Sequence, residues 1–237
     1  GGGFLYHFSD NRIAVGLIVD LNYNNPHHSP FQEFQQYKQH PKIKQFLESG
    51  KRVSYGARAI TKGGLNSLVK MDFDGGMIIG CDAGTLNPGK IKGSHCALQS
   101  GILAAEYINK VLTEEVCDFD DMFKSSTLFK ELHQARNFSS ALHKFGFYGG
   151  SIYNFIESNI FRNKLPINIK DDERDCDSLK LSKDSKKITY PVPDNVISFD
   201  ITSSLFLSGT NHEEDQPVHL KLADAKIPLD YNLKKYD

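Results

Sequence analysis

The sequence predicts an α+β fold, in which mixed or antiparallel sheets pack against helices. Three observations predict this class: an apolar hairpin near the start, a strand that enters a glycine-rich turn and a helix at residues 75–101, and strand-like runs near the end. The 237 residues are enough for one large domain or two small ones with a buried core.

The elements before the glycine-rich turn are predicted from apolar alternation and turn residues. Residues 4–23 read as two strands of an antiparallel hairpin. Ser29 and the proline after it lead into a helix with an aromatic stripe, and a short second helix is expected at 42–48. Further strands are expected at 51–60 and 65–79.

The second half of the chain is expected to be mainly helical before it becomes irregular. A helix over 94–112 has a narrow face of small residues suited to close packing on a sheet, and 113–145 also look helical. Residues 164–195 are rich in Lys, Asp and Ser and predict an extended, mostly exposed connection. Three strand-like runs within 196–237 are separated by a polar turn.

Composition excludes two classes of protein. The formal net charge is -1 with 24% charged residues, so the chain has no electrostatic case for binding nucleic acid. The longest aliphatic run, at 13–19, has the length of a strand and is far too short for a membrane span. The chain starts with Gly1-Gly2-Gly3 in place of Met and shows no signal peptide, as expected of a portion of a longer protein.

The cysteines and histidines predict no metal site in this chain. The wide, uneven spacing of the four cysteines suits neither a zinc knuckle nor a disulfide framework, which favours a reducing compartment. The tail sequence His212-Glu213-Glu214-Asp215 is expected to form a packing and hydrogen-bonding turn, because adjacent residues on an exposed turn rarely converge on one ion. The cysteines are Cys81, Cys96, Cys117 and Cys176.

The glycine-rich turn at residues 75–101 is the strongest candidate for a binding site. Glycines allow a ligand to approach the backbone, and the first amides of the following helix have no partner within it. Ser94 is the expected N-cap, and Lys90 and Lys92 add positive charge. The chain contains neither GxxxxGK[ST] nor GxGxxG after a strand, so this turn is not the main element of a dinucleotide fold.

Several longer strings carry a resemblance to a known family. They are GGxFLYH, GKRxxYGARAI, GGMIIGC with PGKIKGSH, SGILAAE, YGGSIY and SFDITSSLFLSGTNHEEDQPVHL. On these strings the chain resembles electron-transfer-flavoprotein:ubiquinone oxidoreductase over nearly its whole length, most weakly at 113–190. FixC-like and geranylgeranyl-reductase-like flavoproteins, which share the flavin turn but not the tail from 196, remain an alternative. A non-catalytic fragment that keeps only membrane- or partner-binding surfaces is another.

The resemblance implies a membrane-associated flavoprotein that takes electrons from reduced electron-transfer flavoprotein and passes them through FAD and a [4Fe-4S] cluster to ubiquinone. It implies monotopic attachment to the mitochondrial inner membrane or the bacterial cytoplasmic membrane. It also divides the chain into part of a ubiquinone-binding domain (1–75), a FAD-contacting strand, turn and helix (76–115), a helical membrane-associated segment with a linker (116–195), and the start of a ferredoxin-like iron–sulfur region (196–237).

The resemblance also assigns binding residues, while the catalytic residues stay unassigned. The backbone of Gly1 and Gly2 matches the paired glycines that bind quinone in the family. In the flavin turn, Cys81 takes the place of the usual aspartate, and Asp82 follows one residue later. The complete FAD-binding set is Gly80, Cys81, Asp82, Ala83, Gly84, Lys92, Gly93 and Ser94.

The uncharged aromatic stretch at 145–156 is too short to span a membrane, and basic residues flank it on both sides. This pattern suits an element that enters one leaflet, although a buried core helix interrupted by glycines would have the same sequence pattern. The family's monotopic attachment favours insertion. The expected membrane contacts are Phe145, Phe147, Tyr148, Tyr153 and Phe155.

Two parts of the family's machinery are missing from these residues. The four cysteines do not match the spacing of the family's cluster ligands, so the resemblance implies no [4Fe-4S] cluster in this chain. Without a GxGxxG motif to hold the AMP and pyrophosphate half of FAD, the affinity of this chain alone for FAD is expected to be poor. The chain alone is therefore not expected to turn over.

Overall fold

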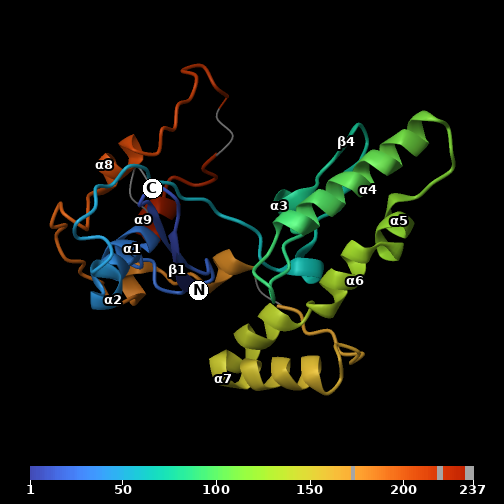
Figure 1. Cartoon of the computed structure of the whole chain (residues 1–237), viewed down its shortest axis with the longest axis horizontal. Helices are drawn as coiled ribbons and strands as arrows, with labels where there is room; N and C mark the ends of the chain where they lie inside the picture. The colour runs from blue at the N-terminus through green and yellow to red at the C-terminus, as the bar shows by residue number, and fades with distance from the viewer. Residues whose placement is uncertain (172–173, 218–220, 233–237) are drawn as a thin grey trace. The chain divides into compact units, whose positions relative to one another are not determined.

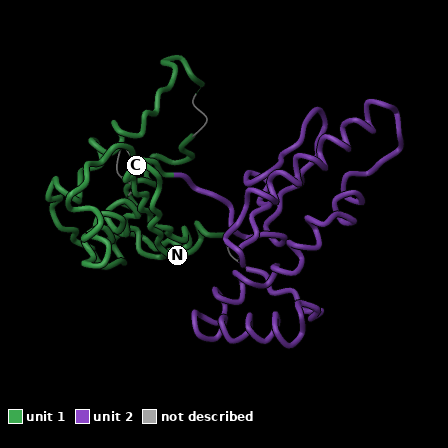
Figure 2. The backbone as a smooth tube through the Cα atoms, in the orientation of Figure 1, with its two compact units in different colours: residues 1–57, 173–237 green, residues 58–172 purple. Residues whose placement is uncertain are grey.

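The computed structural model describes residues 1–171, 174–217 and 221–232. Two compact units divide the chain (Figure 2): residues 1–57 together with 173–237 form unit 1, and residues 58–172 form unit 2. In the sequence, unit 2 therefore lies between the two segments that form unit 1. Helices and two small antiparallel sheets make up the elements, which confirms the α+β class (Figure 1).

Unit 1 begins with the predicted hairpin. Strands β1 (Gly2–His7) and β2 (Ile13–Ile18) pair antiparallel, with Phe4 opposite Gly16. Asp10 and Asn11 both have positive φ, as a tight hairpin turn of this type requires. Helix α1 (Pro30–Gln39) packs on β2 and is capped by the Ser29 hydroxyl, which accepts a hydrogen bond from the Gln32 amide.

The short second helix was predicted in the right place but too long. Helix α2 covers Pro41–Lys44, and residues 45–49 continue as turns. Residues 51–57 have no regular secondary structure, although strand was predicted over 51–60. Tyr55 donates its amide to the Leu207 carbonyl, a single bond that does not make a sheet.

The tail of unit 1 does not form the predicted strands within the described residues: residues 196–200 of the first run form bends and loop, and a helix follows. Helix α8 (Ile201–Phe206) replaces the run SSLFLSG, because the Asp200 carboxylate accepts a hydrogen bond from the Ser203 amide and so caps a helix. A short helix α9 (Ile227–Asp230) follows. The third predicted strand includes residues 218–220, which lie outside the described residues.

The connection predicted at 164–195 has short 3-10 turns, η2 (Asp175–Ser178) and η3 (Ser182–Asp184), and no described strand or α-helix. Its part from residue 174 onward belongs to unit 1 and is anchored there. The Tyr190 hydroxyl donates to Glu33 and accepts from the Ser29 amide, so this segment packs against the start of α1.

Unit 2 contains the helix predicted over 94–112, which is confirmed as α4. The strand predicted over 65–79 is reduced to a short antiparallel pair after a 3-10 turn, and the helical prediction for 113–145 divides into separate helices. The elements are η1 (Gly64–Ser67), β3 (Asp72–Phe73), β4 (Gly76–Met77), α3 (Gly80–Ala83), α4 (Ser94–Leu112), α5 (Phe119–Ser125), α6 (Thr127–Gln134) and α7 (Phe138–Asn159).

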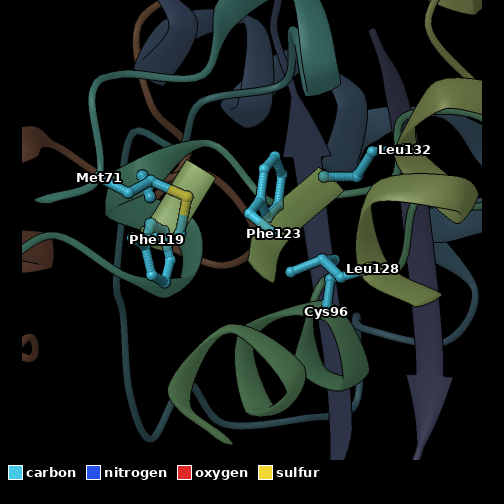
Figure 3. Close-up of a cluster of buried hydrophobic side chains, with 7 residues drawn as sticks. Met71, Cys96, Phe119, Phe123, Leu128 and Leu132 are labelled. Carbon is cyan, nitrogen blue, oxygen red and sulfur yellow. The ribbon is translucent and has the colours of Figure 1, made fainter. Parts of the chain in front are cut away.

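The core of unit 2 lies where α4, α5 and α6 meet the segment before α3 (Figure 3). Helix α4 contributes Cys96, and α6 contributes Leu128 and Leu132, all fully or almost fully buried. Aromatic rings from α5 fill the remaining space. The buried cluster consists of Met71, Ala83, Cys96, Phe119, Phe123, Leu128 and Leu132.

The small-residue face of α4 is mostly uncovered. Ala104 is buried, but Gly101 is half-buried and Ala105 is exposed. No strand within the described residues covers this face, so the predicted packing on a sheet is not seen. The buried side of α4 is instead the stripe of Cys96, Ser100 and Ala104.

Helix α7 is bent sharply at Gly146, where φ is 69° and ψ is 179°. Its two halves pack against each other, because a Cβ atom built on Gly150 would lie 2.6 Å from the Leu142 Cα and 2.7 Å from the Ala141 carbonyl oxygen. Only glycine permits this approach. Of the helices in the described residues, none has the length and apolar character that crossing a membrane requires.

Candidate functional site

The turn after β4 has the backbone shape that its glycines predicted. Helix α3 begins at Gly80 with φ 67° and is followed by its C-cap residue Gly84 with φ 91°, a region that side chains disfavour. The buried Gly80 amide donates to the Ser100 hydroxyl of α4 over 2.9 Å, which holds the turn against that helix. Ala83 and Gly84 are buried, whereas Asp82 is exposed.

The start of α4 differs from the prediction in its cap. Gly93 precedes the helix as N-cap residue, and no side chain of the described residues caps it. Ser94 is the first helical residue and is exposed, so the predicted capping role of Ser94 is wrong. Within the described residues, no side chain accepts a hydrogen bond from the amides of the first turn of this helix. Cys81 lies beside this end, since a Cβ on Gly93 would be 3.5 Å from its Sγ.

An open apolar pocket of about 770 Å³ lies along this junction. It brings together Gly80 and Ser94 from the predicted flavin set, whereas the side chain of Lys92 is exposed outside the lining. The hydroxyl of Thr85, a fully buried residue on the same turn, has no hydrogen-bond partner among the described residues. The pocket is lined by Ile79, Gly80, Ser94, Ala97, Leu98, Gly101, Ile102 and Ala105.

Glu131 of α6 is a functional candidate that sequence reasoning missed. Its Oε1 accepts hydrogen bonds from Asn87 Nδ2 at 2.8 Å, Lys90 Nζ at 2.9 Å and His95 Nε2 at 2.8 Å. Burial alone would raise the pKa of Glu131, but these hydrogen bonds outweigh it and lower the pKa to about 2. Nothing local in the sequence marks this glutamate, which lies 36 residues or more from its partners.

The same cluster contains the group that most resembles a metal site in the described residues. Ligand atoms of His95, Cys96 and Glu131 lie within 4.8 Å of one another. Burial raises the pKa of the Cys96 thiol, and the Glu131 charge adds to the effect. Lys90 already supplies the positive charge beside the carboxylate, so hydrogen bonds satisfy the cluster. With a single cysteine in this group, the thiols of the chain do not fit a [4Fe-4S] cluster.

The predicted quinone contacts lie at the start of β1. Gly1 and Gly2 are both exposed, and Gly2 pairs with Ile18 of β2. No described atom lies within 4 Å of the position that a Cβ on Gly2 would take. One side of this backbone is therefore open to a ligand.

The second half of α7 is polar inside and apolar outside. On its inner side the buried Glu157 accepts a hydrogen bond from Asn137 Nδ2 at 2.7 Å, and Asn154 donates to the Phe138 carbonyl. Tyr153 belongs to this inner side, since its half-buried hydroxyl accepts a hydrogen bond from Asn137. A helix that packed on a protein core alone would show the opposite arrangement.

The outer side of α7 carries the other predicted membrane contacts. Phe147 is 74% exposed, Tyr148 82% and Phe155 63%, which is unusual for neighbouring aromatic side chains. The alternative of a buried core helix interrupted at Gly149-Gly150 does not describe this segment, because the break lies at Gly146 and the aromatic side chains face outward. Further exposed apolar side chains on or just after the helix are Phe145, Ile152, Ile156, Ile160 and Phe161.

Comparisons with known proteins agree along the whole chain. A family model described as "ETF-QO, ubiquinone-binding" matches residues 1–60, and one described as "Electron transfer flavoprotein-ubiquinone oxidoreductase, 4Fe-4S" matches residues 195–237. The electron transfer flavoprotein-ubiquinone oxidoreductase of Pseudomonas aeruginosa is 58% identical over 243 aligned residues that cover all of this chain. Along its whole length the chain is thus similar to the electron transfer flavoprotein-ubiquinone oxidoreductase family.

Other members of the electron transfer flavoprotein-ubiquinone oxidoreductase family show the same coverage. The mitochondrial protein of Mus musculus is 49% identical, and a probable member from Acinetobacter baylyi is 46% identical, each over all of this chain. The chain spans less than half of each relative: 44% of the Pseudomonas protein, 41% of the mouse protein and 45% of the Acinetobacter protein. The range matched by the iron–sulfur model contains no cysteine.

Proposed function

We propose that the chain forms part of an enzyme that takes electrons from reduced electron-transfer flavoprotein and passes them to ubiquinone at a membrane surface. The observation that carries this proposal is the 58% identity with the Pseudomonas aeruginosa oxidoreductase over the entire chain. The match of the tail to an iron–sulfur model of the same family speaks against a FixC-like or geranylgeranyl-reductase-like protein. In this proposal residues 1–75 serve the quinone and residues 76–115 serve the flavin.

The flavin site proposed here is the junction of α3 and α4. When bound, FAD supplies the reversible two-electron chemistry of its isoalloxazine ring. The amides of Gly93 and Ser94 would donate hydrogen bonds at the start of a 19-residue helix, whose dipole favours negative charge there. The apolar pocket would exclude water from one edge of the ring.

The remaining residues of the predicted flavin set are assigned backbone or peripheral roles. Gly80, Ala83 and Gly84 would shape the turn, since all of them are buried. Cys81 replaces an aspartate of the family pattern, and its half-buried thiol lies next to Gly93. Asp82 and Lys92 are exposed and would contact only the outer parts of FAD.

The quinone contact proposed here uses the peptide groups of Gly1 and Gly2. A bare backbone can offer an N–H or C=O group to a quinone carbonyl within an apolar surrounding. The open side of Gly2 and the exposed Tyr6, which lies further along the same strand, are consistent with this role. The cysteines do not fit an iron–sulfur cluster, so the electron path proposed for these residues uses the flavin and quinone contacts alone.

We assign the apolar side of α7 to a membrane surface, as monotopic attachment requires. Its inner side is fully engaged in hydrogen bonds to Asn137 and Phe138, so the aromatic side chains cannot turn inward without breaking them. The basic residues Lys144, Arg162 and Lys164 flank the apolar side chains, where they would meet lipid headgroups. The membrane would be the mitochondrial inner membrane or the bacterial cytoplasmic membrane.

A segment exchange tests the enzymatic proposal. Residues 1–237 would replace the matching segment of the Pseudomonas aeruginosa relative, and the chimera would be assayed for bound flavin and for ubiquinone reduction by reduced electron-transfer flavoprotein. We expect flavin at about one equivalent and turnover within about tenfold of the unaltered relative. A folded chimera that binds FAD but never reduces ubiquinone would favour a non-catalytic fragment.

Lipid vesicles test the membrane proposal with the chain itself. We expect the chain to sediment with vesicles that contain anionic lipid, and the double variant Phe147→Asp/Phe155→Asp to lose this binding at least tenfold. The matched control is Val192→Asp/Leu112→Asp, which adds the same charges at apolar positions that are 90% and 78% exposed elsewhere. Equal loss in both variants would mean that α7 is not the attachment site.

A further inference from the structure

We propose that Glu131 is a positioning residue that clamps the 87–95 turn in the shape that the flavin contacts require. This inference rests on the proposed function, because it concerns the same junction of α3 and α4. The clamp consists of Glu131 and its hydrogen-bond donors Asn87, Lys90 and His95.

The donors occupy both ends and the middle of the turn. Asn87 lies where the turn leaves the buried segment, and His95 lies in the first turn of α4. Between them, Lys90 reaches the same oxygen through its ammonium group. A single carboxylate oxygen on α6 therefore fixes the segment that contains Lys92, Gly93 and Ser94.

The backbone of the turn needs such a restraint. Asn87 and Lys92 exchange hydrogen bonds, with N···O distances of 3.1 Å and 3.4 Å, and form an isolated bridge. Between them, Ile91 has φ 53° although its side chain is β-branched, a conformation that costs free energy. Ile91 is also 74% exposed, so packing does little to hold it there.

The position of Glu131 explains how the clamp stays rigid. Its side chain is 19% exposed, and the neighbouring Leu128 and Leu132 on α6 are fully buried in the core of unit 2. The carboxylate is thus presented from a fixed helix rather than from a loop. Asn87, Lys90 and His95 all act as donors to this one carboxylate, so removing its charge weakens all three hydrogen bonds of the clamp.

Limited proteolysis of the chain tests the clamp without flavin. Trypsin cleaves after Lys92, inside the turn, and we expect Glu131→Gln to accelerate this cut at least tenfold. The matched control is Glu157→Gln, which removes the charge of a buried glutamate that accepts a hydrogen bond from Asn137 in α7. Equal rates of cleavage after Lys92 in the two variants would overturn the clamp.

The chimera with the Pseudomonas relative tests the link to flavin. We expect Glu131→Gln to weaken FAD binding at least tenfold and to change the visible circular dichroism of the bound flavin, while Glu157→Gln leaves both within twofold. A variant that speeds cleavage yet leaves flavin binding and dichroism unchanged would overturn the positioning role. If the unsubstituted chimera binds no flavin, the proposed function itself fails, and the positioning role fails with it even when proteolysis shows a clamp.

Discussion

Glu131 accepts hydrogen bonds from three side chains that lie 36, 41 and 44 residues before it in the sequence, and it does so as an anion. The hydrogen bonds from Lys90 and His95 favour the charged carboxylate strongly enough to overcome the effect of burial. Because the folded pKa is about 2 and the ordinary value is 4.5, the folded state holds this proton less tightly than the unfolded state. The stabilisation from Glu131 is therefore fully present above about pH 4.5 and is lost as the pH falls toward 2.

This linkage predicts how Glu131→Gln responds to pH. The difference in unfolding free energy between wild type and variant should be largest above pH 5 and should shrink steadily between pH 4.5 and pH 2. Urea unfolding at several pH values, followed by circular dichroism, measures this difference. A difference that stays constant down to pH 2 would contradict the lowered pKa.

Gly150 allows a different prediction at the same scale. In Gly150→Ala the new methyl group would meet backbone atoms of Ala141 and Leu142, which cannot move as a side-chain end could. We expect a loss of roughly 2 kcal/mol or more in unfolding free energy. Gly101→Ala is the control. Its new Cβ would lie 3.8 Å from Ile79, an ordinary van der Waals contact, and alanine would replace glycine within a helix. That change should stabilise the chain by up to about 1 kcal/mol.

At the scale of elements, the sequence predicted those whose signals are local. The hairpin of β1 and β2, the helix α1 that follows Ser29 and the bounds of α4 are confirmed, because turn residues and the apolar period decide them within a few positions. The strands predicted at 51–60 and 203–209 are wrong. The first finds no partner to form a sheet, and Asp200 caps the second segment as a helix.

The cap of α6 provides a prediction for an element. The Ser126 hydroxyl accepts a hydrogen bond from the Phe129 amide at 3.0 Å and begins the helix that presents Glu131. Ser126→Ala should lower the unfolding free energy by about 1 kcal/mol. The adjacent Ser125→Ala should cost less than about 0.5 kcal/mol, because that exposed hydroxyl only donates to carbonyl groups of its own helix. Thermal unfolding of both variants measures the contrast, and equal losses would mean that the cap does not stabilise α6.

For the molecule as a whole, the sequence predicted the class and the candidate binding segments but not how distant segments cooperate. The turn at 80–94 could be found because its four glycines lie close together, at positions 80, 84, 89 and 93. The acceptor that holds it, Glu131, could not, since only the packing of α6 against the turn brings them together. The sequence also could not show that the aromatic side chains of α7 face outward, because a run of aromatic residues has the same pattern whether it faces inward or outward.

The chain should bind FAD weakly when it is on its own. The chain contains no GxGxxG motif to bind the AMP and pyrophosphate half of FAD. It would therefore contact FAD mainly at the flavin ring. We expect a dissociation constant at least about 100-fold higher for the chain than for the chimera, equivalent to roughly 3 kcal/mol. Fluorescence titration of FAD measures both, and near-equal constants would mean that these 237 residues suffice for the cofactor.

The outward aromatic side chains of α7 also bear on how this polypeptide can be handled in the laboratory. Phe147, Tyr148 and Phe155 would meet the same side chains of other copies in plain buffer, since their helix cannot rotate to hide them. A mild detergent above its micelle concentration should therefore keep preparations monodisperse, whereas dilution of that detergent should bring on turbidity.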